Sequence, residues 1–127
     1  MTTRIIRPFH AIAALALAVL ALALLASAHT VAGASAASTT TIHVSEKEFS
    51  IKLSNGSLAR PGTVTFDVKN AGKMAHNFRI NGKQTQLIQP SKTATLTVAF
   101  KKKGSYYYLC AVSGHAALGM KGVFTVR

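Results

Sequence analysis

Apolar and polar side chains alternate one by one in three segments of this chain, residues 49–54, 63–68 and 95–100. A period of two places the apolar side chains on one face of a β-strand and the polar ones on the other. This alternation is typical of half-buried strands in antiparallel sheets. Shorter apolar stretches predict four further strands, at residues 41–45, 76–81, 105–111 and 121–127.

Turn-forming residues separate these segments, as in Asn55-Gly56 and Asn81-Gly82. Seven short strands at this spacing predict an all-β domain, a β-sandwich or a barrel. The run Lys101–Lys103 is expected to mark an exposed turn. We expect an aliphatic interior whose bulk comes from five aromatic residues, Phe49, Phe66, Phe78, Phe100 and Phe124.

The first 36 residues differ from the rest in composition. Arg4 and Arg7 precede an apolar run, residues 11–28, and small residues follow it. A basic start, an apolar middle and a small-residue exit are typical of a secretory signal peptide. An uncleaved membrane anchor is the alternative, since about 18 apolar residues is near the shortest span that crosses a bilayer. We therefore expect a leader at residues 1–36 that is cleaved after Ala28, Ala34 or Ala36. One domain would follow at residues 37–127, and the protein would be periplasmic or secreted.

The chain is strongly basic, with 15 Lys and Arg, 3 Asp and Glu, and a net charge of +12. Without Arg4 and Arg7, 13 basic residues remain against 3 acidic ones, a charge of +10. This charge suits an acidic protein partner or an anionic membrane surface. It equally fits a solvated basic surface with no partner. No helix or aromatic-basic motif indicates nucleic acid, and we expect a monomer.

A thiol, an imidazole and a thioether follow one another at equal intervals in Cys110-x4-His115-x4-Met120. They are three of the four donors of a mononuclear blue-copper site, which adds a second histidine. His76 is the candidate for that fourth donor. Cys110 is the one cysteine of the chain, so an internal disulfide is excluded, and an inert buried thiol is the alternative. Met74 is a rival thioether that we assign to packing.

The order His76-Asn77, then Cys-x4-His-x4-Met with a glycine before the second histidine, resembles the cupredoxins, and more closely their small plastocyanin- and azurin-like members. The resemblance covers roughly residues 40–127. It implies a Greek-key β-sandwich that holds one type 1 copper ion, with His76, Cys110 and His115 as equatorial ligands and Met120 as the axial ligand. It also implies that Asn77 ties the ligand loop by hydrogen bonds. The loop lacks the proline often found between the cysteine and the second histidine.

These residues predict an exported blue-copper protein that passes single electrons between redox partners and is not an enzyme. Electrons would leave through the edge of His115, beside the apolar stretch 116–118. Lys73 and Lys121 would steer an acidic partner. The alternative is a copper-binding protein for copper delivery or tolerance, without a redox partner. A third reading is a secreted sandwich domain that has lost its metal and only binds partners.

Overall fold

The computed structural model describes residues 39–127, so the expected leader and the domain boundary at residue 37 lie outside the described residues. All regular secondary structure in this part of the chain is β-strand. The described residues contain no helix that is long and apolar enough to cross a membrane. Residues 39–127 form nine strands, which are β1 (Thr40–Lys47), β2 (Ser50–Leu53), β3 (Ser57–Leu58), β4 (Gly62–Asn70), β5 (Arg79–Ile80), β6 (Lys83–Gln84), β7 (Thr93–Phe100), β8 (Gly104–Leu109) and β9 (Lys121–Val126).

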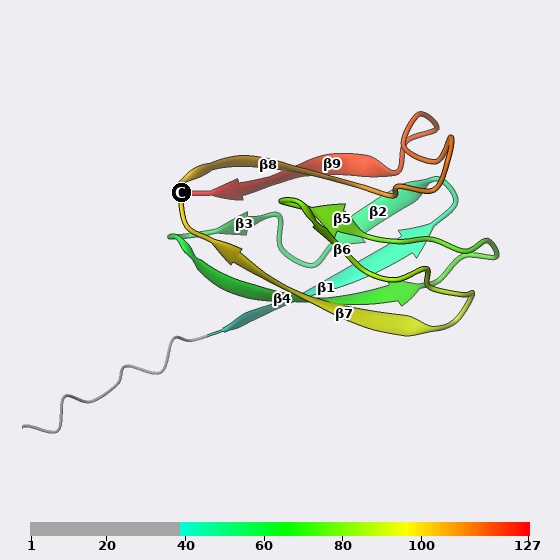
Figure 1. Cartoon of the computed structure of the whole chain (residues 1–127), viewed down its shortest axis with the longest axis horizontal. Helices are drawn as coiled ribbons and strands as arrows, with labels where there is room; N and C mark the ends of the chain where they lie inside the picture. The colour runs from blue at the N-terminus through cyan, green and yellow to red at the C-terminus, as the bar shows by residue number, and fades with distance from the viewer. Residues whose placement is uncertain (1–38) are drawn as a thin grey trace, which may run out of the picture. The chain divides into compact units, whose positions relative to one another are not determined.

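The strands form two sheets that pack face to face (Figure 1). One sheet has the order β2-β1-β4-β7 and the other the order β3-β9-β8-β5-β6. The chain passes from one sheet to the other after β2, β3, β4, β6 and β7. The two sheets bury their apolar side chains in one shared core. The all-β, Greek-key sandwich expected from the sequence is therefore confirmed.

Two strand pairs are parallel, although the alternation suggested antiparallel sheets. β1 runs parallel to β4, from Thr40 beside Val64 to Glu46 beside Asn70, and β3 runs parallel to β9. Parallel neighbours need a crossover rather than a tight turn. The excursion through β3 in the other sheet supplies this crossover, because it returns the chain to the start of β1 before β4 begins.

The strand expected at residues 76–81 is much shorter than predicted. Only Arg79 and Ile80 are in a sheet, while His76 forms an isolated bridge with Ile88. The Asn81-Gly82 turn is confirmed, since both residues have the positive φ angles (49° and 72°) of a two-residue hairpin turn. The strands β3 and β6 escaped prediction because two residues cannot show a period.

The centre of the core is an aromatic cluster around Phe66. Its ring lies 5.1 Å from that of Phe78, 6.3 Å from that of Phe100 and 5.7 Å from that of Phe124. All four side chains are fully buried. The prediction that Phe49 belongs to this set was wrong, because its side chain is only partly buried at the edge of the core.

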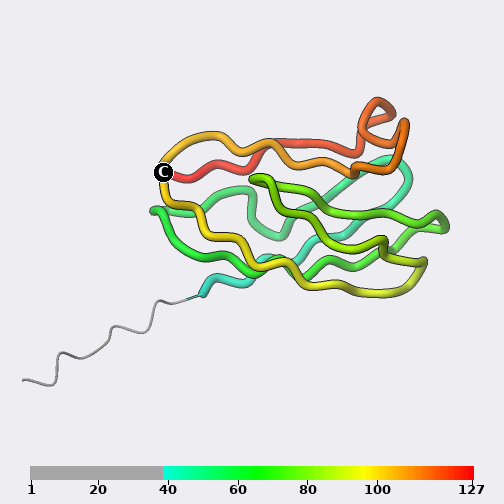
Figure 2. Tube along the Cα trace, viewed as in Figure 1, coloured from blue at the N-terminus to red at the C-terminus, as the bar shows by residue number. Residues whose placement is uncertain are grey.

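One end of the domain gathers three connections that are distant in sequence. Figures 1 and 2 show there the turn between β1 and β2, the loop after β4, and the loop between β8 and β9. The C-terminus lies at the opposite end. The expected turn at Lys101–Lys103 is exposed and precedes β8, so it lies at that opposite end as well.

Candidate metal centre

Cys110 and His115 come from the loop that joins β8 to β9. Cys110 directly follows β8, and its backbone N–H donates to the carbonyl of Met120 at 2.9 Å. The N–H of Met120 in turn donates to the carbonyl of His115 at 3.1 Å. Gly114 and Gly119 have φ angles of 82° and 125°, which L side chains rarely adopt. The two glycines therefore let the loop fold back toward Cys110.

His76 reaches the same place from the loop after β4. Its N–H and C=O both pair with the backbone of Ile88, at 3.1 and 2.7 Å. The buried side chain of Asn70 fixes this pair, since its Nδ2 donates to the carbonyls of Met74 and Ile88 at 2.7 and 2.8 Å. These hydrogen bonds fix the backbone at His76, although it lies outside the named strands.

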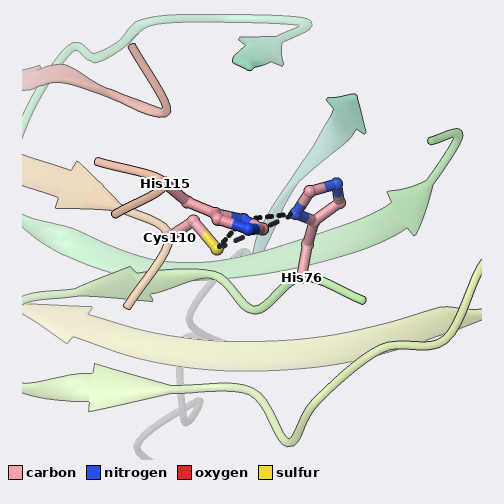
Figure 3. Close-up of side chains that lie close together, drawn as sticks. All are labelled: His76, Cys110 and His115. Carbon is pink, nitrogen blue, oxygen red and sulfur yellow. Dashed lines mark hydrogen bonds between the residues drawn. The ribbon is translucent and has the colours of Figure 1, made fainter. Parts of the chain in front are cut away.

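The three side chains point their donor atoms at one another (Figure 3). The Nδ1 atoms of His76 and His115 are 3.1 Å apart, and the Sγ of Cys110 lies 3.9 and 3.7 Å from them. A point equidistant from the corners of a triangle with these sides lies about 2.1 Å from each, and metal–nitrogen and metal–sulfur bonds in proteins are about 2.0–2.3 Å. The three atoms are therefore spaced so that they would hold one ion between them.

The other ring nitrogen of His76 faces a carboxylate. Its Nε2 lies 3.1 Å from Oε1 of Glu48, in the turn between β1 and β2. A carboxylate accepts hydrogen bonds, so His76 carries its proton on Nε2 and directs the lone pair of Nδ1 at the other donors. A partner of this kind fixes the tautomer and the ring orientation of a metal-binding histidine.

Glu48 itself is strongly held as an anion. The backbone amides of Met74 and Lys73 donate to its Oε1 at 2.6 and 2.7 Å. These interactions lower the pKa of Glu48 from 4.5 to about 2. The hydrogen bond from the Met74 amide has the largest effect, and the hydrogen bond from the His76 ring adds to it. The carboxylate is therefore ionised throughout the physiological pH range.

A hydrogen bond outside the donor triangle joins the two loops that carry the candidate donors. The Oδ1 of Asn77 accepts the backbone N–H of Ala111, next to Cys110, at 2.7 Å. This confirms the expected role of Asn77 in tying the ligand loop to its neighbour.

A sequence profile of the cupredoxin-like domain matches residues 14–126 of the chain. The chain belongs to the cupredoxin family. Its cupredoxin fold places His76, Cys110 and His115 in position for a single copper ion. No curated protein sequence matches the chain.

Solved structures of auracyanins are similar to this cupredoxin. Dithionite-reduced auracyanin from Roseiflexus castenholzii is 25% identical with a TM-score of 0.59, over 72% of this chain and 98% of that one. Auracyanin A, a "blue" copper protein from Chloroflexus aurantiacus, is 21% identical with a TM-score of 0.59, over 71% of this chain and 100% of that one. Auracyanin B is 20% identical with the same TM-score, over 72% and 90%. The last two show the likeness in fold alone.

Met120 lies fully buried at the end of the cupredoxin's ligand loop, bridged to Cys110 through the backbone. The rival thioether is in a different environment. Met74 is 46% exposed, so its expected role in packing was wrong. His43 pairs with Asp67 at 3.3 Å on the outer face of the first sheet, away from the metal centre.

Sequence reasoning missed Glu48 and Phe49. The ring of Phe49 packs edge-on against His115, 5.4 Å between centroids. Neither residue belongs to a sequence motif with the candidate ligands. Glu48, for example, lies 28 residues before His76 in the sequence. One signal was present. The chain has only three acidic residues, and two of them, Glu46 and Glu48, lie between the first two predicted strands.

Proposed function

We propose that this cupredoxin is an exported type 1 blue-copper protein that carries single electrons between redox partners. The observation that carries the proposal is the triangle of His76 Nδ1, His115 Nδ1 and Cys110 Sγ, sized for one ion. The bound metal would supply the Cu(I)/Cu(II) couple. Met120 would add the weak axial thioether that such sites use.

The residues around the donors favour electron transfer because they resist rearrangement. Asn77 fixes the start of the ligand loop, Met120 closes it onto Cys110, and Glu48 fixes the ring of His76. A site held in one geometry in both oxidation states changes state with little reorganisation. The same constraints leave no open position for a substrate, so we propose no enzymatic activity.

Electrons would leave through His115. It is the only one of the four proposed ligands with any exposure, 4% against 0% for His76, Cys110 and Met120. Leu118, three residues further along, is 62% exposed beside the small side chains of Ala116 and Ala117. This surface would let a partner approach the ring closely and exclude water.

The experiment that tests the function is a copper titration followed by visible absorption and electron paramagnetic resonance. We expect one equivalent of Cu(II) to produce an intense thiolate-to-copper band near the red and the small hyperfine splitting of a type 1 site. A colourless copper complex would contradict the proposal. Rapid loss of copper to a competing chelator would favour delivery or tolerance instead, although the burial of the donors opposes fast exchange.

The basic surface gives a prediction about redox partners. Lys73 and Lys121 are exposed and close in sequence to His76 and Met120. We propose that they steer acidic partners, so oxidation by anionic ferricyanide should slow as salt is added. Changing both lysines to glutamate should lower that rate by about tenfold or more. Lys101→Glu with Lys103→Glu makes the same charge change at the far end and should have little effect. Equal effects of the two pairs would show that only net charge matters.

We also propose export, with residues 1–36 as a cleaved leader, on the composition of that segment. The N-terminal residue of the mature protein tests this. A chain that still begins at Met1 in the membrane fraction would show an anchor instead.

A further inference from the structure

The turn between β1 and β2 touches both of the candidate histidine ligands from outside. Oε1 of Glu48 lies 3.1 Å from Nε2 of His76, and the ring of Phe49 packs edge-on against His115. In Figure 1 this turn lies at the same end of the domain as the two loops that carry the donors. Consecutive residues of one turn therefore contact two side chains that lie 39 positions apart in sequence.

Two glycines leave the space that this turn occupies. A Cβ atom on Gly72 would lie 2.5–2.8 Å from the carboxylate of Glu48. A Cβ atom on Gly119 would lie 2.8 Å from the carbonyl oxygen of Phe49. Real Cβ contacts are essentially never this short, so both loops carry a glycine where the turn approaches them.

The three acidic residues of the chain have different surroundings. Asp67 pairs with His43 on the outer face of the first sheet, and Glu46 points into the core. Glu48 is the one that contacts a candidate ligand. Its Oε1 accepts three hydrogen bonds, two from backbone amides and one from His76, so both its position and its charge are fixed.

We propose that Glu48 is a positioning residue of the metal site, which holds the His76 ring with Nδ1 facing inward and lowers the reduction potential of the bound ion. This inference rests on the proposed function. A carboxylate on the outer nitrogen raises the basicity of the ligand, and a nearby negative charge stabilises the more highly charged ion. Cu(II) therefore gains more from Glu48 than Cu(I) does.

The variant Glu48→Gln tests the charge, because glutamine keeps the size and the acceptor oxygen. Loss of such a partner typically weakens metal binding by about 10–100-fold. We expect Cu(II) affinity to fall by about tenfold while Cu(I) affinity changes little, and the potential to rise by about 59 mV for that tenfold difference. Asp67→Asn is the matched control, since it removes one negative charge elsewhere and should leave the potential unchanged.

A second variant moves the carboxylate without removing it. Gly72→Ala should push the flexible end of Glu48 away from His76 and raise the potential in the same direction. Gly56→Ala is its control, because nothing lies within 4 Å of a Cβ at that position. An unchanged potential in both Glu48→Gln and Gly72→Ala would overturn the proposal.

A metal-free measurement separates this proposal from the proposed function. Nitrogen-15 NMR of the apoprotein should show His76 protonated at Nε2 in the wild type and in Glu48→Gln, and a mixture of tautomers in Glu48→Ala. The same tautomer in Glu48→Ala would contradict the positioning role. If the wild type bound copper without a blue band, the proposed function would fail while this measurement still decided the role of Glu48.

Discussion

The Cys110→Ala protein is expected to lose both its blue colour and most of the stability that copper adds. In the proposed type 1 site the Cys110 thiolate would be the donor responsible for the intense band, and its Sγ is one corner of the donor triangle. A ligand at about a thousandfold its Kd stabilises the folded state by about 4 kcal/mol. A domain of this size gains about 4–8 °C in Tm per kcal/mol. Wild type should therefore melt roughly 15–30 °C higher with copper, and Cys110→Ala should show little shift.

Calorimetry with and without copper measures the shift, and absorption spectra of the same samples measure the colour. The apoprotein of Cys110→Ala should lose only about 1 kcal/mol, because one small buried group is removed. Ser113→Ala is the control in the same loop, where the side chain is exposed and should not matter. A copper-bound Cys110→Ala protein with the full stability gain would mean that the thiol is not a ligand.

The second large effect concerns Glu46, whose carboxylate is buried in the core at the end of β1. Neither oxygen has a hydrogen-bond partner, and burial raises the pKa of Glu46 from 4.5 to about 7. The folded state therefore keeps its proton where the unfolded chain has lost it. Stability from this group is complete below pH 4.5 and falls as the pH rises to about 7. The total loss is about 3 kcal/mol.

Urea unfolding of the apoprotein at pH 5 and pH 8 measures this dependence. Glu46→Gln should flatten it, because glutamine does not titrate. Glu46→Leu should be more stable than wild type at pH 8, because an apolar side chain of similar volume replaces a buried charged one. All other groups are the same in these proteins, so their contribution cancels in the difference. Parallel curves for wild type and Glu46→Gln would show that Glu46 is solvated or paired.

Much of the fold follows from local pattern. Alternation marked the long strands because each of them buries one face. In β8, for example, alternate residues Tyr106 and Tyr108 face inward, and Tyr107 between them is 75% exposed. The parallel pairing of β1 with β4 was not predictable, because it depends on a crossover through the other sheet. Phe49 was misplaced for a related reason: its period matches the strand, but it lies before β2 and packs on His115.

The site divides in the same way. The three candidate donors of the ligand loop were visible because one short segment carries them, and His76 followed as a candidate from the need for a second imidazole. Glu48 and Asn70 were invisible as contributors to the site because they act through contacts between segments distant in sequence. The role of Asn77 was expected only from the family resemblance, and its hydrogen bond to Ala111 bears it out.

The polarity of the domain matters for how the protein can be immobilised. Cys110 follows the end of β8, whereas Arg127 follows Val126, which pairs with Gly104 at the start of that strand. β1 also begins at this remote end, since Thr40 lies beside Val64 near the start of β4. A tether attached at either Thr40 or Arg127, whether to a bilayer, a fusion partner or an electrode, therefore leaves the exposed Leu118 and the nearby edge of His115 at the free end of the domain.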